Sequence, residues 1–257
     1  MTYTQVALRT RFRHESKIFM TSASTVAADD HPDLPARVEA AAAMRRLSHA
    51  IASRRLDVPD LHRIAATADE LAAEIETQPA RGRLDEIMAS PRFEAAIASN
   101  SLSQAVGDGA FVDLFHDSPV SGSANPFSMG LQISRDGDVA VGAITLGPGW
   151  EGAPERGHGG IVAACVDETM GGLLPIIGSM AFTGELTVKY RAPCPLATPL
   201  EFRASVKRRE GRKLYIECTG KSADLLFVEA NAVFIVVQLD QIANLVTSSS
   251  TGSDADQ

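Results

Sequence analysis

The sequence predicts an α+β fold in which an antiparallel sheet packs against one central helix and a helical extension comes first. Three observations lead to this prediction. Apolar residues recur at helical spacing early in the chain, apolar and polar residues alternate late in it, and one glycine-opened apolar segment interrupts the alternating stretches. A chain of 257 residues is long enough to bury such a core without disulfides or metals.

Residues 31–115 are expected to form the helical extension. The pattern predicts one helix over 34–56 and a second that begins near Asp57, and their apolar faces are expected to pack together as a hairpin. Shorter helices are expected at 83–89 and 92–99. The apolar positions are Val38, Ala42, Leu47 and Ile51 in the first long helix, and Leu61, Ile64, Ala68, Leu71 and Ile75 in the second.

The sheet domain is expected over residues 125–238, after a loop-rich linker at 107–126 that is marked by glycine, proline and serine. Residues 1–30 are expected to be disordered or weakly ordered, although their basic character also fits a transit-like segment. Residues 239–257 read as a disordered tail. Strands are expected at 128–134, 139–146, 182–191, 200–208, 213–221 and 226–238.

Charge is distributed unevenly along the chain. The net charge is −8, yet residues 181–222 hold nine bases and four acids, a local balance of +5 that leaves −13 for the rest. This argues against general nucleic-acid binding and fits a site for a small polyanion, while a solvated strand face with alternating charges fits equally well. The candidate anion-binding residues are Arg191, Arg208, Arg209, Arg212 and Lys213.

Cysteine and histidine usage excludes several kinds of site. Three cysteines form no C-x-x-C pair, which favours a reduced, cytoplasmic setting. The six histidines show no metal-ligand spacing, so neither a metal site nor a cofactor is expected. No apolar run is long enough to predict a membrane span.

The candidate reactive centre lies in the glycine-opened segment. Gly157-His158-Gly159-Gly160 precedes an apolar helical stretch that contains two acids, Asp167 and Glu168. The free N–H groups at the start of a helix attract negative charge, and glycines allow a ligand to approach the backbone. Acids in an apolar helix need a partner or a task.

This run, followed by Phe182-Thr183 and by Tyr190-Arg191-Ala192-Pro193, resembles the hotdog-fold acyl-CoA thioesterases, in particular the phenylacetate-pathway (PaaI-like) group. The resemblance covers residues 125–238. It implies the hotdog fold, an antiparallel sheet wrapped around a central helix. It also implies hydrolysis of an acyl-CoA thioester to a carboxylic acid and coenzyme A.

The resemblance assigns roles to individual residues. It implies that the N–H of Gly160, with or without Gly159, polarises the thioester carbonyl, and that Asp167 acts as base or nucleophile. Thr183 matches a strand hydroxyl that positions water, and His158 matches the motif histidine.

The distance between the start of the helix and Asp167 predicts the oligomeric state. If the helix begins near Gly160, the rise to Asp167 is about 10 Å, too far for an aspartate to meet a carbonyl held at the helix start. The acid and the polarising N–H must therefore come from two chains, which predicts a homodimer or dimer of dimers with composite active sites. The resemblance implies the same.

Purely structural explanations of these residues remain open. His158 could only orient its loop, Asp167 could be a structural ion-pair partner, and Thr183 could be an ordinary strand threonine. Glu168 points about 100° away from Asp167 on a helix, so it is expected at a surface or interface, or as the substitute base. The alternative function is a non-catalytic acyl-CoA sensor or assembly module whose N-terminal helices bind a partner.

Overall fold

The computed structural model describes residues 32–82, 86, 107–112 and 115–237. Its centre is a six-stranded sheet with the strand order β1-β2-β4-β5-β6-β3, and every neighbouring pair is antiparallel. The predicted α+β class is therefore confirmed. The strands are β1 (Gln132–Asp136), β2 (Val139–Thr145), β3 (Ala181–Tyr190), β4 (Pro199–Glu210), β5 (Lys213–Ser222) and β6 (Leu225–Val236).

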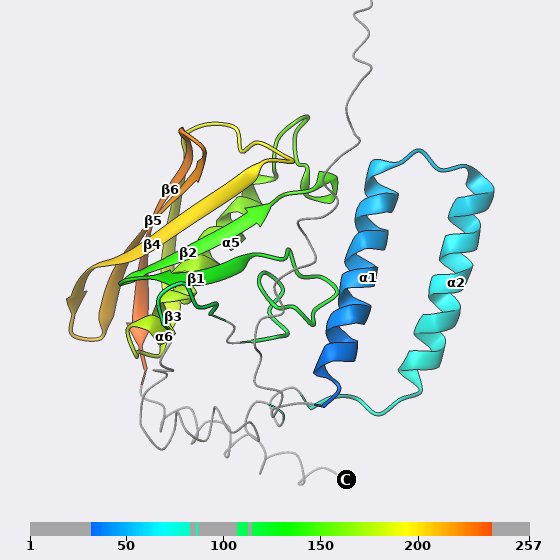
Figure 1. Cartoon of the computed structure of the whole chain (residues 1–257), viewed down its shortest axis with the longest axis horizontal. Coiled ribbons are helices and arrows are strands. Elements are labelled where there is room, and N and C mark those ends of the chain that lie inside the picture. The colour runs from blue at the N-terminus through cyan, green and yellow to red at the C-terminus, as the bar shows by residue number, and fades with distance from the viewer. Residues whose placement is uncertain (1–31, 83–85, 87–106, 113–114, 238–257) are drawn as a thin grey trace, which may run out of the picture.

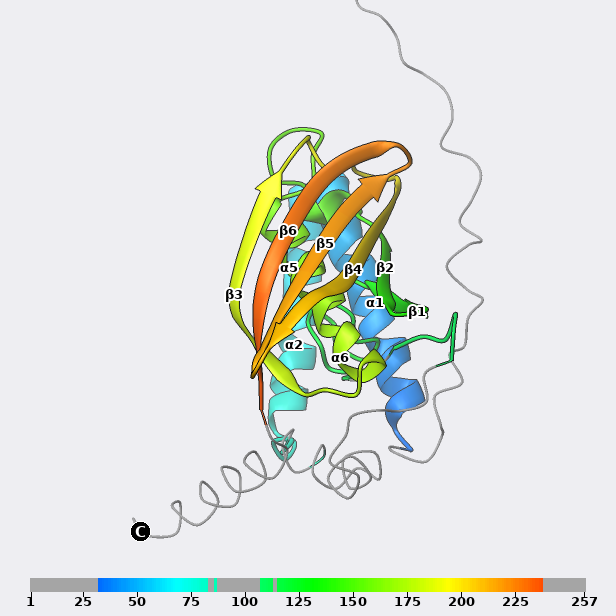
Figure 2. The same cartoon turned by 90° about the vertical axis from the view of Figure 1, so that its left-hand side faces the viewer.

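One helix, α5 (Gly159–Gly171), lies against the sheet, and the short helix α6 (Leu173–Ile176) follows it. Figures 1 and 2 show the strands curving around α5, which contacts β2, β3, β4 and β5. The stretch Gly159–Ile176 meets the length and composition of a membrane span. Half of that stretch is buried within the fold, so enclosure by the sheet accounts for its apolar sequence.

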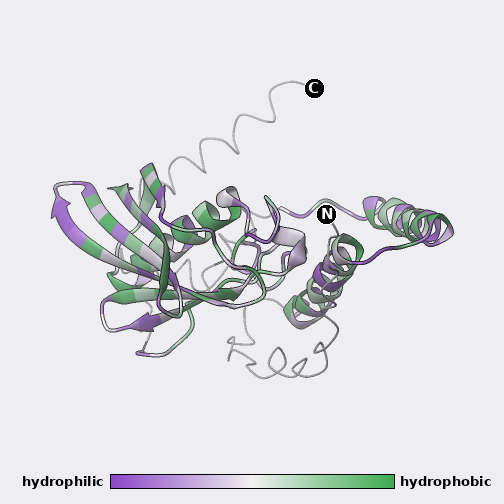
Figure 3. Ribbon diagram, turned by 90° about the horizontal axis from the view of Figure 1, so that it is seen from above, coloured by the Kyte–Doolittle hydropathy of each residue, from purple (hydrophilic) through white to green (hydrophobic). Residues whose placement is uncertain are grey.

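The core between sheet and helix depends on the strand alternation, which Figure 3 shows as changes of colour along the strands. Phe202 and Phe227 are fully buried and meet edge to face, with ring centroids 5.6 Å apart. Gly220 lies beside them, and a Cβ there would be 2.5 Å from Val228 and 2.9 Å from Phe227. A larger residue at position 220 would therefore displace the aromatic pair.

Two helices, α1 (Leu34–Ser53) and α2 (Val58–Glu76), precede the sheet domain, close to the predicted bounds. Asp57 caps α2 with its side chain, as expected. Leu34 and Ala41 of α1 are buried, and Figure 1 shows α1 between α2 and the sheet domain. The predicted packing of the two apolar faces against each other is wrong within the described chain, because α2 has no buried residue and α1 turns to the sheet domain instead.

The expected linker is partly ordered against β1. The Gly109 N–H donates to the Arg135 carbonyl, and the Val112 N–H donates to the Ile133 carbonyl, both at 2.8 Å. These bonds satisfy the edge of β1 that β2 leaves open. Several predicted segments lie outside the described residues, apart from Glu86: 1–30, 83–89, 92–99 and 239–257.

Burial predicts how stability responds to core and surface truncation. Phe202→Ala should lower the free energy of unfolding by about 3–5 kcal/mol, because a fully buried ring leaves a cavity. Leu71→Ala in α2, where the side chain is 53% exposed, should change it by less than about 1 kcal/mol. Urea unfolding of both variants measures the difference, and equal losses would contradict this description of the core.

Candidate active site

The first turn of α5 is built by His158. It is the N-cap residue, its Nδ1 accepts the Gly160 N–H at 3.1 Å, and its carbonyl accepts the N–H groups of Ile161 and Val162. The Gly160 N–H, predicted to polarise a carbonyl, thus already has a partner in this structure. No described residue accepts a hydrogen bond from the Gly159 N–H, which leaves it as the available donor at this helix end.

The glycines before α5 are held by close contacts. The Gly157 N–H donates to the Cys194 carbonyl at 2.9 Å, and a Cβ at Gly157 would be 3.0 Å from Leu146. The Tyr190 hydroxyl donates to the Gly159 carbonyl at 2.8 Å, and a Cβ at Gly159 would be 3.3 Å from that hydroxyl. Tyr190 therefore ties the end of β3 to the start of α5, a role that sequence reasoning missed.

Asp167 is half-buried further along α5, and the Thr183 hydroxyl donates to its Oδ1 at 2.9 Å. Burial, the largest effect, raises the pKa of Asp167; the Thr183 hydrogen bond lowers it and the neighbouring Glu168 charge raises it. The structure thus brings two predicted site residues together. A carboxylate with a raised pKa is a stronger base.

A β-bulge aims Thr183 at α5. On β6, Thr183 pairs with Phe234 and Glu185 pairs with the next residue, Val233, so the strand register shifts between them. Two residues that would normally share a face thereby point to opposite faces, and Thr183 turns to the helix side while Glu185 stays on the outer side. The bulge at Gly184 is therefore part of the site.

Glu168 has a structural partner. The Ser118 hydroxyl donates to Glu168 Oε1 at 2.5 Å, and the Ser121 hydroxyl donates to the same oxygen. The half-buried carboxylate thus holds the loop that carries these serines against α5. Glu168, expected at a surface or interface or as a substitute base, instead holds a loop of its own chain.

The predicted anion-binding residues fall into two groups. Arg191 pairs with Glu229 at 2.5 Å, and its N–H donates to the Phe227 carbonyl near the start of β6. Arg212 donates from Nε to the Val236 carbonyl at the other end of β6, close to Arg208, Arg209 and Lys213 at the β4–β5 turn. Nine residues of strand, about 30 Å, separate the two groups, so one chain cannot bring both to a single phosphate.

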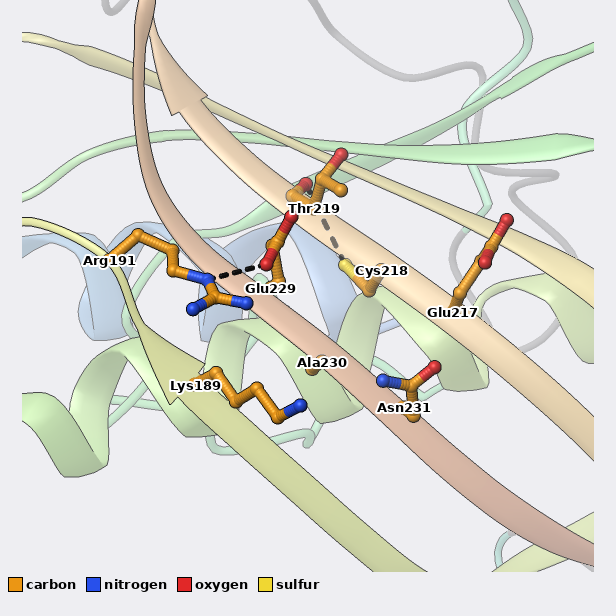
Figure 4. A pocket seen from close by; sticks show the side chains of 8 residues that line it. All are labelled: Lys189, Arg191, Glu217, Cys218, Thr219, Glu229, Ala230 and Asn231. Atoms are coloured by element: carbon orange, nitrogen blue, oxygen red, sulfur yellow. Dashed lines mark hydrogen bonds and ion pairs between the residues drawn. The ribbon is translucent and has the colours of Figure 1, made fainter.

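A shallow groove on the outer sheet face is shown in Figure 4. Lys189, Arg191, Glu217, Glu229 and Asn231 are among its lining residues, and charges of both signs meet there. Arg191 is the only predicted site residue that lines this groove. The motif residues lie on the helix side, so the candidate site is placed at α5.

Cysteine and metal chemistry find no support in the described part of the chain. The three thiols are buried and unpaired, and burial raises their pKa values, to about 12 for Cys165 and Cys218 and about 11 for Cys194. Thiols of this kind are poor nucleophiles. Among the described residues, no group of three or more His, Cys, Asp or Glu side chains could hold a metal ion.

Comparison with known proteins agrees with this fold. Residues 157–228 match the family described as the thioesterase superfamily. A crystal structure of a thioesterase superfamily protein superposes with a TM-score of 0.60 and 21% identity, over 77% of this chain and 90% of the other. Residues 157–228 thus match the thioesterase superfamily, and the superposition shows the hotdog fold that the motif resemblance predicts.

Two curated relatives extend the comparison. This chain is 37% identical over 87 residues to acyl-coenzyme A thioesterase THEM4 of Mus musculus. The aligned residues are 33% of this chain and 37% of that protein. It is also 37% identical over 91 residues to acyl-coenzyme A thioesterase THEM4 of Xenopus laevis, which covers 35% of this chain and 41% of that protein. The matches thus span less than half of either relative.

The raised pKa of Asp167 predicts that its charged form lowers the free energy of unfolding, and that this loss depends on pH. An acid whose pKa is higher in the folded state binds its proton more tightly there, so stability falls as pH rises from the ordinary carboxyl pKa through the folded one. Asp167→Asn keeps an acceptor for Thr183 and removes the charge. It should therefore raise the free energy of unfolding relative to the unmodified chain at pH 7.5.

The advantage of Asp167→Asn should shrink at pH 4, because the raised pKa leaves more of this carboxyl protonated in the folded chain than at pH 7.5. Urea unfolding at the two pH values measures it, with Asp69→Asn on exposed α2 as the control. An Asn variant that is less stable at pH 7.5 would show that the charged form is favoured by folding.

Proposed function

We propose that this chain is an acyl-CoA thioesterase that hydrolyses an acyl-CoA to a carboxylic acid and coenzyme A. The proposal depends on two groups that lie on α5. The Gly159 N–H at its start is available, and the half-buried carboxylate of Asp167 is oriented by Thr183. The family of residues 157–228 and the names of the THEM4 relatives support the same reaction. The expected cytoplasmic location stays a prediction.

The reaction follows from these groups. Asp167 takes a proton from water as the water oxygen attacks the thioester carbonyl carbon. The negative charge that forms on the carbonyl oxygen is stabilised by the N–H of Gly159. The carbon–sulfur bond then breaks, the electron pair leaves with the coenzyme A sulfur, and that sulfur takes up the proton from Asp167.

The two groups must come from different chains. Gly159 and Gly171 bound one continuous helix, so Gly159 and the Asp167 of the same chain are separated by a rise of about 12 Å. The half-site formed by Asp167 and Thr183 and the half-site formed by Gly159 and Tyr190 are therefore two ends of one protomer. We infer that the working unit is a homodimer in which unlike half-sites meet.

The edge of the sheet suggests how the half-sites of two chains meet. β3 is an edge strand of ten residues, and its helix-facing Leu186 and Val188 are only partly buried. An edge of this length is a template for a second strand. If two β3 strands pair antiparallel about their middle, the Thr183 end of one chain lies beside the Tyr190 end of the other, and Asp167 meets the partner chain's Gly159.

The same arrangement unites the basic residues. Arg191 follows Tyr190 in the chain, while Arg212 and Lys213 lie at the sheet end that holds the start of β3. Antiparallel pairing places Arg191 of one chain and the β4–β5 turn of the other at the same end of the dimer. The phosphates of coenzyme A would then be held between two chains, which resolves the separation of these residues in one chain.

Removal of the carboxylate tests the function. Asp167→Ala should lower kcat for acyl-CoA hydrolysis by about 10²–10³-fold, since it removes the base while the fold and the N–H donor remain. Release of free thiol measures turnover, Asp69→Ala on α2 is the control, and sedimentation should give twice the 27.3 kDa chain mass for both.

Two outcomes would contradict the proposal. Wild-type kcat in Asp167→Ala would remove this carboxylate from the mechanism. Thermal stabilisation of the unmodified chain by acyl-CoA without thiol release would favour a non-catalytic sensor.

A further inference from the structure

The first helix reaches the loop before the candidate site through His49. The His49 Nδ1 accepts the Gly149 N–H at 3.3 Å, and the imidazole meets the Trp150 ring edge to face, with centroids 5.6 Å apart. A Cβ at Gly147 or Gly149 would lie 3.3 Å or 2.6 Å from His49 Nδ1. The glycines of this loop therefore leave space that the imidazole occupies.

The loop passes this contact on to the start of α5. Gly149 and Trp150 belong to the short 3-10 helix η1 (Pro148–Trp150). The Trp150 carbonyl accepts the His158 N–H at 2.9 Å, and His158 caps Gly160 with its Nδ1. A continuous series of contacts thus joins α1 to the turn that presents the Gly159 N–H.

His49 is not what holds α1 in place. Arg37 pairs with Asp117 at 2.6 Å, and Arg45 donates to the carbonyls of Ser123 at 3.2 Å and Asn125 at 2.7 Å. These contacts attach α1 to the segment before β1, about one turn and three turns of helix before His49. Truncation of His49 should therefore release the η1 loop and leave the helix attached.

Burial supports the role of His49 as an acceptor. The half-buried imidazole has a lowered pKa, caused by desolvation, so it stays neutral at pH 7 and Nδ1 keeps its lone pair for the Gly149 N–H.

We propose that His49 is a positioning residue for the thioesterase reaction: it sets the η1 loop, and through Trp150 and His158 it sets the Gly159 N–H that polarises the carbonyl. The N-terminal helix α1 is thereby part of the catalytic architecture. This inference rests on the proposed function. Because polarisation of the carbonyl matters in the transition state, misplacement of the Gly159 N–H lowers kcat more than it raises KM.

A double-mutant cycle in the full chain tests the inference. His49→Ala and Gly149→Ala are made singly and together, with His49→Asn as the conservative variant and His62→Ala on exposed α2 as the matched control. Gly149 has no positive φ, so alanine there is hindered only by His49. Trp150 is the one tryptophan of the chain, so its fluorescence reports directly on the His49 contact.

His49→Ala and Gly149→Ala should each lower kcat by about tenfold, change KM little and shift Trp150 emission. The double variant should lose less than the product of the two single losses, because the clash at Gly149 disappears with the imidazole. His49→Asn should recover most of kcat, since Oδ1 can replace Nδ1 as acceptor. His62→Ala should match the unmodified chain.

The outcomes separate the two proposals. An unmodified chain without turnover removes the proposed function, and this inference falls with it. An active unmodified chain whose His49→Ala variant shifts Trp150 emission yet keeps full kcat overturns this inference alone. A kcat loss that merely follows the fraction of unfolded protein, measured by circular dichroism on the same samples, also overturns it.

Discussion

The rigidity of α5 is the constraint on which the candidate site depends. A helix enclosed by a sheet cannot bend to bring its N-terminal N–H to an acid two turns later, so the rise of about 12 Å between Gly159 and Asp167 is fixed. Every other feature of the site is arranged around these two fixed points. The strand β3 contacts both, with Thr183 at the acid and Tyr190 at the N-terminal turn.

Local departures from regular structure aim the side chains. The bulge at Gly184 turns Thr183 to the helix side of an edge strand, and the unusual histidine cap orders the glycines at the start of α5. The loop before this cap is in turn shaped by an imidazole from α1. The site thus draws on three separate parts of the chain, and the extension α1 is one of them.

Periodicity and glycine placement in the sequence are sufficient to predict most of the helices and strands. The alternating strands, the enclosed helix and the two long helices follow from patterns that local residues determine. The roles of Asp167, Thr183 and His158 come from motif resemblance, and two contacts between predicted site residues lie within one chain: Thr183 with Asp167, and Gly160 with His158. Sequence patterns missed Tyr190 and the serines that hold Glu168, because these contacts join segments far apart in the chain.

The burial of α2 was also mispredicted from sequence. Its apolar stripe is typical of a packed helix, but periodicity states which residues share a face and not what covers that face. The same limit applies to the Gly160 N–H, whose occupation by His158 depends on a side-chain rotamer.

Complementation between two inactive chains tests the composite site most directly. Gly159→Pro removes the available N–H at a helix position that accepts proline, and His158 before it is already extended at φ −63° and ψ 132°. Asp167→Ala removes the base. A purified heterodimer of the two variants contains one intact composite site, so it should recover about half of the unmodified activity while each parent homodimer stays inactive. A heterodimer as inactive as its parents would contradict a site shared between chains.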